Sequence, residues 1–159
     1  MFLFRRNKKV ELLAPIAGES IDITKVSDMT FSEKILGDGI AIIPSQGRVV
    51  SPVDGTVEQM FDTGHAASIR AENGLELLIH VGIDTVELKG EHFTPLVSSG
   101  AKVKVGDPLM EFDPKGITKA GYEIVSPIVI LNTPDYSNIS IVKEGAVKEL
   151  QPVMELEKK

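Results

Sequence analysis

The dipeptide Asn73-Gly74 lies between two runs in which apolar and polar residues alternate. In this setting Asn-Gly is a strong signal for a tight β-hairpin, because both residue types accept the positive φ angles of a two-residue turn. With these two residues at the centre of the turn, Ala67 faces His80 across the hairpin. His65 lies two residues from Ala67 on the same strand and so points to the same side. The sequence therefore predicts that the two imidazoles are diagonal cross-strand neighbours, with backbones about 7–8 Å apart.

This pairing divides the predicted hairpin into two unlike faces. One face is expected to join the core: Leu75, Leu77, Ile79 and Val81. The other carries both histidines among apolar and ionisable residues: His65, Ala67, Ile69, Glu76, Leu78 and His80. Burying an imidazole among apolar groups costs free energy unless the ring is hydrogen-bonded. Two histidines on one face make a chemical role about as probable as a purely structural one. A register slip of one residue would put the rings on opposite faces.

The chain from residue 10 onward reads as short strands separated by turns. The segments VELLAPIAGESIDI, GIAIIPSQGRVVSPVDGTVEQMF and YEIVSPIVILN are rich in Val and Ile, with Pro and Gly at the breaks. This pattern is typical of all-β proteins. Only residues 25–36 and 93–99 are expected to form a helical turn or two. We therefore expect an all-β fold, an antiparallel β-sandwich or barrel-like structure with only short helical turns.

Internal similarities suggest a duplication. Residues 14–18 (APIAG) resemble residues 51–55 (SPVDG), and SPIV at residues 126–129 repeats the start of that pattern. Residues 100–112 (GAKVKVGDPLMEF) resemble residues 145–156 (GAVKELQPVMEL) after one gap. Chance similarity between turn-rich strands is the alternative. A duplication predicts two similar sheet units packed on one core.

Length and composition limit the classes of protein to which the chain can belong. Its 159 residues suffice for a single domain, predicted at residues 10–159. Residues 1–9 carry four cations and no acid, which predicts a flexible basic segment with at most peripheral contact to an anionic membrane. The net charge of −6 argues against nucleic acid as a partner. The chain has no cysteine, which excludes disulfides and thiolate chemistry and fits a cytoplasmic protein.

Several separated motifs resemble one known family. They are LLIHVGIDTVELKGEHF at residues 77–93, KILGDGIAIIPSQGRVVSPVDGTV at 34–57, FDTGHAASI at 61–69 and GAKVKVGDPLMEFD at 100–113. Together they resemble the glucose-type enzyme IIA of the bacterial phosphoenolpyruvate-dependent sugar phosphotransferase system. The resemblance implies an antiparallel β-sandwich with a duplicated hybrid motif. It also implies a phosphocarrier that needs no cofactor.

The resemblance assigns roles to the two histidines. His80 is expected to accept a phosphoryl group on Nε2 from phospho-HPr and to pass it to a cysteine of a sugar-specific IIB domain. Its Nδ1–H is expected to donate to a backbone carbonyl, with Gly82 the candidate. His65 is expected to stabilise the phosphoryl oxygens, while the Thr63 hydroxyl orients its ring. Imidazole suits such a relay because it is largely neutral near pH 7 and nucleophilic.

Further residues are expected to bind the protein partners. The resemblance places Asp38 and Asp84 beside His80, where they would meet a basic partner such as HPr; a turn-forming role is the alternative for both. An apolar rim is expected from Phe31, Ile40, Phe61 and Leu78, and burial in the core is the alternative for each of the four. No metal is required, although adventitious zinc between His65 and His80 is one option. Regulatory protein targets are also expected, without any indication of which, and the sequence does not specify the sugar.

Three other functions compete with the relay. A zinc metallopeptidase of the lysostaphin type would use paired histidines, but the segment 79–81 lacks the His-x-His pair that such an enzyme requires. A biotinyl or lipoyl carrier module would have a lysine at a hairpin tip, where this chain has Glu-Asn-Gly. A plain β-sandwich adaptor would leave two histidines on one face unexplained.

Overall fold

The computed structural model describes residues 8–159. The predicted flexible basic segment falls mostly on residues 1–7, which lie outside this range. Lys9 already belongs to the first strand, β1 (Lys9–Leu13), which pairs with β14 (Pro152–Lys158). Within the described residues, no helix is long and apolar enough to cross a membrane.

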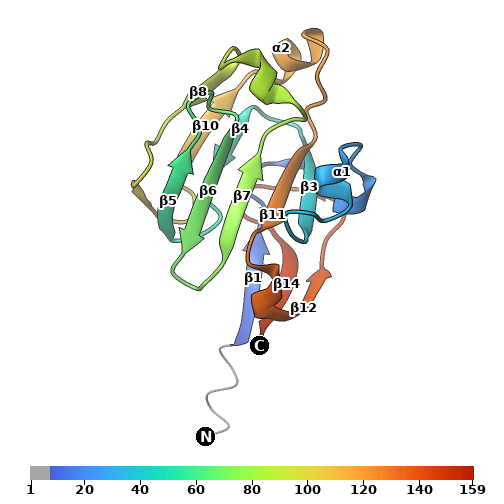
Figure 1. The fold of residues 1–159 in the computed structure, drawn as a ribbon, viewed down its shortest axis with the longest axis vertical. Coiled ribbons are helices and arrows are strands. Elements are labelled where there is room, and N and C mark those ends of the chain that lie inside the picture. Colours follow the sequence, from blue (N-terminus) through green and yellow to red (C-terminus); the bar gives the residue numbers. More distant parts are fainter. Residues whose placement is uncertain (1–7) are drawn as a thin grey trace, which may run out of the picture.

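Three antiparallel sheets form the structure (Figure 1). The largest has eight strands in the order β13 (Gly145–Val147), β2 (Gly18–Asp22), β3 (Gly39–Pro44), β11 (Ser126–Ile130), β7 (Glu76–His80), β6 (Ala66–Ala71), β5 (Gly55–Met60) and β9 (Lys102–Val103). One small sheet has the order β1, β14 and β12 (Tyr136–Ile141). The other has the order β4 (Arg48–Val50), β10 (Pro108–Phe112) and β8 (Phe93–Pro95). The expected all-β antiparallel fold is confirmed.

The helical segments are short, as expected, but not all lie where the sequence placed them. α1 (Met29–Ser32) falls within the predicted region at residues 25–36, and a 3-10 turn, η2 (Ile23–Lys25), precedes it. The helical turn expected at residues 93–99 is wrong, because β8 there pairs with β10. α2 (Pro114–Lys119) and the 3-10 turns η3 (Thr85–Leu88) and η4 (Thr133–Asp135) were not predicted. α2 has proline at its first turn, a recognised helix-start signal.

The strand order has the symmetry that a duplication would produce. Reading outward from the β11–β7 contact, β3, β2 and β13 on one side correspond to β6, β5 and β9 on the other. β10 and β14, which contain the second pair of similar segments, are each the centre of a three-stranded sheet. One unit is therefore continuous, at residues 48–112, and the other combines residues 9–44 with 126–158. The SPIV similarity has no place in this symmetry, because it lies inside β11.

Equivalent hydrogen bonds support the same correspondence. The Ala14 N–H donates to the Gln151 carbonyl at 2.8 Å, and the Ser51 N–H donates to the Asp107 carbonyl at 2.8 Å. Leu150 has φ +68°, while Gly106 at the matching position has φ +92°. The two units therefore share turn geometry as well as strand order.

The centre of the eight-stranded sheet is buried on both faces. All five residues of β11 are buried, as expected for a strand covered on both sides. One face packs on the main core, which includes Ile79 and Ile128. The other is covered beside α1 by a smaller cluster that includes Phe31 and Val129. The end of β7, with His80, lies at the edge of this smaller cluster.

Candidate functional site

The β6–β7 hairpin has a register one residue away from the predicted one. Ala66, and not Ala67, pairs with His80. The Ala71 N–H donates to the Leu75 carbonyl at 2.7 Å, so the loop contains three residues, 72–74. Gly74 has φ +99°, as in three-residue hairpin loops that end in a left-handed residue. The two-residue turn was therefore a wrong prediction, although the hairpin itself is confirmed.

The two histidine rings meet in spite of this shift. Their centroids are 4.9 Å apart and their planes are inclined at 81°. His65 precedes the first residue of β6 and follows Gly64, which has φ +71°. Because His65 lies in this loop and not within the strand, the alternation of strand side chains does not decide where its ring points. The prediction that the two imidazoles are neighbours is confirmed. The loop before β6 brings the rings together, and the strand register does not.

His80 is held in one tautomer by a backbone carbonyl. Its Nδ1 lies 2.7 Å from the Gly82 carbonyl oxygen, which is the expected contact. A carbonyl can only accept, so Nδ1 carries the proton and Nε2 keeps its lone pair. The His80 side chain is half-buried. Its Nε2 therefore has a lone pair that is available for nucleophilic attack.

His65 is a buried, neutral ring. The residue is only 3% exposed, and its Nδ1 contacts the Thr63 hydroxyl as the family resemblance implied. The rings of Phe61 and Phe93 lie at centroid distances of 5.4 and 6.5 Å from it. Burial, assisted by the neighbouring His80, lowers the pKa of His65 to about 4. His65 is therefore uncharged at neutral pH and can act as a hydrogen-bond donor or acceptor.

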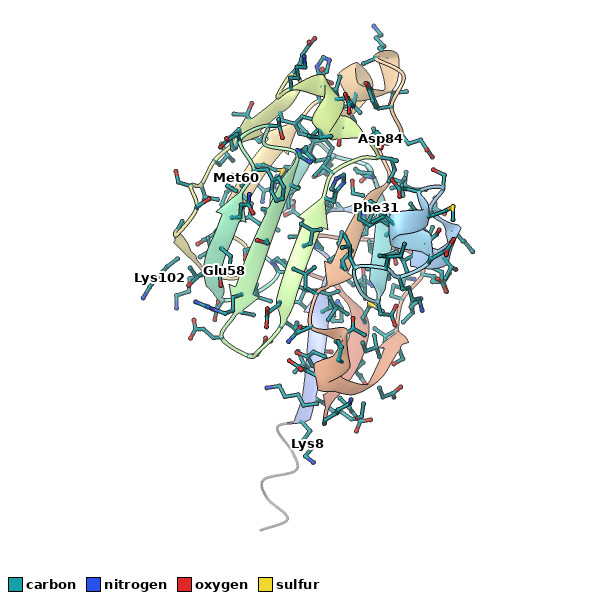
Figure 2. All side chains as sticks on the ribbon, in the orientation of Figure 1. Lys8, Phe31, Glu58, Met60, Asp84 and Lys102 are labelled. Atoms are coloured by element: carbon teal, nitrogen blue, oxygen red, sulfur yellow. The ribbon has the colours of Figure 1, made fainter. Side chains whose placement is uncertain are left out.

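Opposing effects act on the charge of His80. Burial lowers the pKa of His80, while the Gly82 carbonyl and the carboxylates of Asp28 and Asp84 raise it. Asp84 has φ +59° and is exposed beyond the end of β7 (Figure 2). Asp28 caps α1 by accepting the Thr30 N–H at 2.8 Å. Asp28 was not predicted, although an Asp directly before a short helix is a recognisable cap signal.

Three of the four residues predicted to form the apolar rim lie around the histidine pair, and the fourth is buried in the core. The Phe31 ring lies 5.1 Å from that of His80, Phe61 contacts His65, and Leu78 packs half-buried beside Phe31 in the smaller cluster. Ile40 is fully buried in the main core, so its assignment to a surface rim is a correction. Asp38 immediately precedes β3, and its carboxylate lies 3.3 Å from the Lys34 ammonium nitrogen. A docking role for Asp38 stays a prediction.

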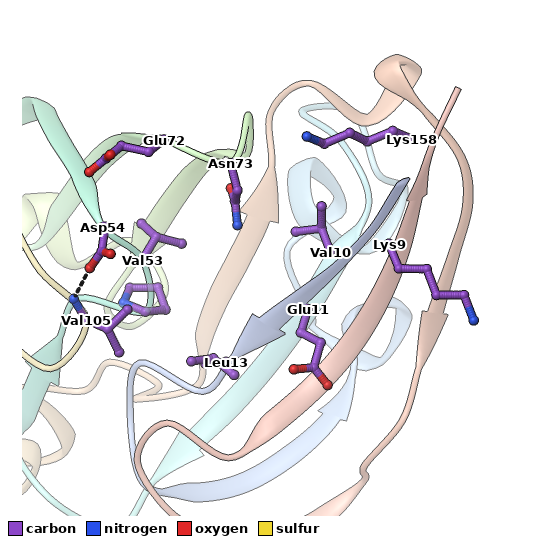
Figure 3. Close-up of a pocket in the computed structure, with 11 residues that line it drawn as sticks. Lys9, Val10, Glu11, Leu13, Val53, Asp54, Glu72, Asn73, Val105 and Lys158 are labelled. Carbon is purple, nitrogen blue, oxygen red and sulfur yellow. Dashed lines mark hydrogen bonds between the residues drawn. The ribbon is translucent and has the colours of Figure 1, made fainter. Parts of the chain in front are cut away.

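The third histidine has polar contacts of its own, outside the pair. His92 faces Glu91 and Asp113, with nitrogen to oxygen distances of 3.5 and 3.8 Å. In the described part of the chain, no three His, Cys, Asp or Glu residues are grouped so as to hold a metal ion. A pocket of about 460 Å³ opens beside Asn73, at the end of the hairpin opposite to the histidines (Figure 3). We therefore take the histidine pair as the site.

Comparison with known proteins gives consistent matches. The family model described as phosphoenolpyruvate-dependent sugar phosphotransferase system, EIIA 1, matches residues 10–136. The glucose-specific EIIA component of Staphylococcus aureus (strain Mu50) is 45% identical over 149 residues, covering 91% of this chain and 90% of that protein. The β-glucoside-specific EIIBCA component of Dickeya chrysanthemi is 48% identical over 145 residues, which are 91% of this chain but 23% of that protein. The solved structure of glucose permease IIA from Mycoplasma capricolum superposes with a TM-score of 0.88 at 38% identity, covering 94% of this chain and 97% of that one.

Proposed function

Because the chain belongs to the EIIA 1 family of the phosphoenolpyruvate-dependent sugar phosphotransferase system, and is thus a phosphocarrier component of it, we propose that His80 carries the phosphoryl group. Membership of this family sets aside the zinc peptidase, carrier-module and adaptor alternatives. Glucose and β-glucosides, named for the relatives above, are the candidate sugar classes. The cytoplasm is the proposed location.

The observation that carries the proposal is the bond between His80 Nδ1 and the Gly82 carbonyl. With the proton fixed on Nδ1, the Nε2 lone pair attacks the phosphorus atom as the bond between phosphorus and the donor nitrogen breaks. The phosphorylated ring bears positive charge, and the Gly82 carbonyl stabilises it through the same hydrogen bond. Asp28 and Asp84 also stabilise the charged ring, but they repel the phosphoryl oxygens. That repulsion favours onward transfer.

His65 is proposed to stabilise the phosphoryl group and not to carry it. If the Thr63 hydroxyl donates to Nδ1 of His65, the ring proton is on Nε2 and can be donated to a phosphoryl oxygen. The donor is neutral and held in a buried position, so it needs little reorganisation during transfer. Phe31, Phe61 and Leu78 around the pair would exclude water that could hydrolyse the phosphorus–nitrogen bond.

The partners proposed are HPr as donor and the IIB domain of a sugar permease as acceptor. Asp84 is exposed near the histidine pair, and a basic partner surface would complement its charge and that of Asp28. Asp38 is proposed for the same role at the edge of this surface. Transfer between docked proteins requires neither a nucleotide nor an obligatory metal.

The first experiment tests the site of phosphorylation. The protein is incubated with enzyme I, HPr and labelled phosphoenolpyruvate, and the label is expected to be acid-labile and base-stable. His80→Ala should reduce incorporation to background, because it removes the nucleophile. His92→Ala is the matched control, since it removes a histidine that lies apart from the pair, and it should incorporate label normally. Full labelling of His80→Ala would overturn the assignment.

A second experiment separates the roles of the two histidines. His65→Gln keeps the His80 nucleophile, so phosphoryl uptake should persist. Transfer to IIB is expected to slow by about 100-fold, the usual effect of removing a donor to developing negative charge. Single-turnover kinetics of both steps measure this difference. Loss of all labelling in a folded His65→Gln protein would contradict a purely stabilising role.

A further inference from the structure

Two buried hydroxyl groups lie beside the His80 loop and have no part in the chemistry described above. Ser126 and Thr85 are both fully buried. The Thr85 hydroxyl donates to the Val81 carbonyl. The Ser126 hydroxyl donates to the Ile124 carbonyl at 2.8 Å and accepts the Gly82 N–H at 3.3 Å. Both side chains therefore contact the backbone immediately after His80.

These bonds fix the two peptide planes that flank Gly82. The first plane contains the Val81 carbonyl and the Gly82 N–H, and Thr85 and Ser126 hold its two ends. The second contains the Gly82 carbonyl, which accepts from His80, and the Ile83 N–H, which donates to the Glu123 carbonyl at 3.0 Å. The orientation of the Gly82 carbonyl is thus set from both sides.

This arrangement matters because residue 82 must be glycine. Gly82 has φ +78°, and an added Cβ would lie 2.5 Å from Thr85 Cγ2 and 2.9 Å from the Glu123 carbonyl oxygen. Glycine has the widest backbone freedom of any residue, so its own geometry does not fix the carbonyl direction. External hydrogen bonds must supply that constraint.

We propose that Ser126 and Thr85 are positioning residues, which act through the Gly82 carbonyl to hold His80 in its Nδ1–H tautomer. Without the Ser126 hydroxyl, the buried Gly82 N–H loses its partner and the peptide plane can rotate. The Nδ1–H tautomer then loses part of its preference, and Nε2 holds the lone pair in a smaller fraction of molecules. The kinetic part of this inference rests on the proposed function, whereas the tautomer part does not.

The test reads the tautomer directly in the unphosphorylated, full-length protein. Long-range ¹H–¹⁵N spectra give the shifts of both ring nitrogens of His80. In the parent protein they should report a protonated Nδ1 and an unprotonated Nε2. In Ser126→Ala and Thr85→Val both shifts should move toward averaged values, and phosphoryl uptake from phospho-HPr should slow about three- to tenfold, as expected for one lost hydrogen bond.

Ser20 provides a matched control. Ser20 and Ser126 are both buried, and both are opposite Ile42, on the two strands that flank β3. The Ser20 hydroxyl also donates to a backbone carbonyl, that of Lys143, at 2.9 Å. Ser20→Ala should lose stability without moving the His80 shifts. Thr85→Ser keeps the hydroxyl and should restore the parent shifts, which allows a decision even if Ser126→Ala does not fold.

Unchanged His80 shifts in folded Ser126→Ala or Thr85→Val would overturn the proposal. So would an equal shift in Ser20→Ala. If the parent protein is not phosphorylated on His80 but the shifts respond as expected, the positioning role stands and the proposed function fails.

Discussion

At the scale of single residues, the site depends on which nitrogen of each imidazole holds its proton. The Gly82 carbonyl decides this for His80, because it can only accept. The Thr63 hydroxyl can donate or accept, so for His65 the tautomer depends on both groups together. The Nε2 lone pair of His80 is thus free for the nucleophilic role proposed above, and His65 can donate a hydrogen bond to a phosphoryl oxygen only in one arrangement of its contact with Thr63.

Thr63→Val tests this dependence. It leaves a buried ring nitrogen of His65 without its partner, which should lower the free energy of unfolding by about 1–3 kcal/mol. Transfer to IIB should slow more than uptake from HPr, as proposed for the loss of His65 itself, because the role proposed for His65 is to stabilise the phosphoryl group and not to act as the nucleophile. Urea unfolding and single-turnover kinetics measure the two effects. Thr63→Ser keeps the hydroxyl and should behave like the parent, and a valine variant equal to the serine variant would contradict the prediction.

Where a family motif was specific, the contacts expected for single residues are present, while their roles stay predictions. His80, His65, Thr63 and the Gly82 carbonyl were all named from the family motifs, and their mutual contacts are present. Asp28 was missed because its proximity to His80 depends on how the connection between β2 and β3 folds over the sheet. Ile40 was misplaced because an apolar residue in a strand has the same pattern whether it faces the core or a surface.

At the scale of the elements, the hairpin shows what a turn signal can predict. Asn73-Gly74 correctly indicated where the chain reverses, but two-residue and three-residue loops share this dipeptide. The choice between them shifts the pairing of every residue in both strands. The side chain of Asn73 accepts the Leu75 N–H at 3.1 Å, a local bond that accompanies the longer loop. Local sequence alone does not separate these two turns.

Two glycines with positive φ angles give a prediction at this scale. Gly74→Ala should cost about 1 kcal/mol of stability through backbone strain, because an added Cβ there meets only Lys158 at 3.7 Å. Gly82→Ala should cost more and should also impair phosphoryl uptake, because its Cβ would lie 2.5 Å from Thr85. Thermal unfolding and labelling measure both effects. Equal losses in the two variants would show that the surroundings of Gly82 are less constrained than its contacts indicate.

At the scale of the whole molecule, His65 links stability to pH. Its pKa of about 4 in the folded state is below the value near 6.5 expected for the unfolded chain. Between these values the unfolded state binds more protons, so stability should fall as the pH is lowered from about 6.5 to 4, by about 3 kcal/mol in total. Burial lowers the pKa of His80 as well, so its contribution has the same sign.

Urea unfolding at pH 7, 5.5 and 4.5 measures this loss. His65→Gln should reduce the slope of stability against pH, because glutamine does not titrate. His92→Gln is the control that changes a histidine away from the pair. A slope unaltered by His65→Gln would show that other groups cause the acid destabilisation.

The overall architecture was predictable to different extents. Val- and Ile-rich segments with Pro and Gly breaks were sufficient for the fold class, and the similarity between residues 100–112 and 145–156 correctly indicated equivalent strands. The SPIV similarity was misleading, since it arises within β11 and not before an equivalent strand. The strand order of the eight-stranded sheet depends on long-range pairing, for which no local pattern provides a signal.

One unit of the fold is continuous and the other combines two segments that are far apart in the sequence, which has a consequence for biosynthesis. On the ribosome, residues 48–112 can form the strand pairs within their own unit soon after they emerge, while β7 must still wait for β11. β1 cannot pair so early, because its partner β14 lies far along the chain, with Lys9 opposite Glu157. The early strands must therefore wait with unpaired edges, a state prone to aggregation and typical of slowly folding β topologies. Pairing of β1 with β14 is thus expected to be a late step in the folding of the nascent protein.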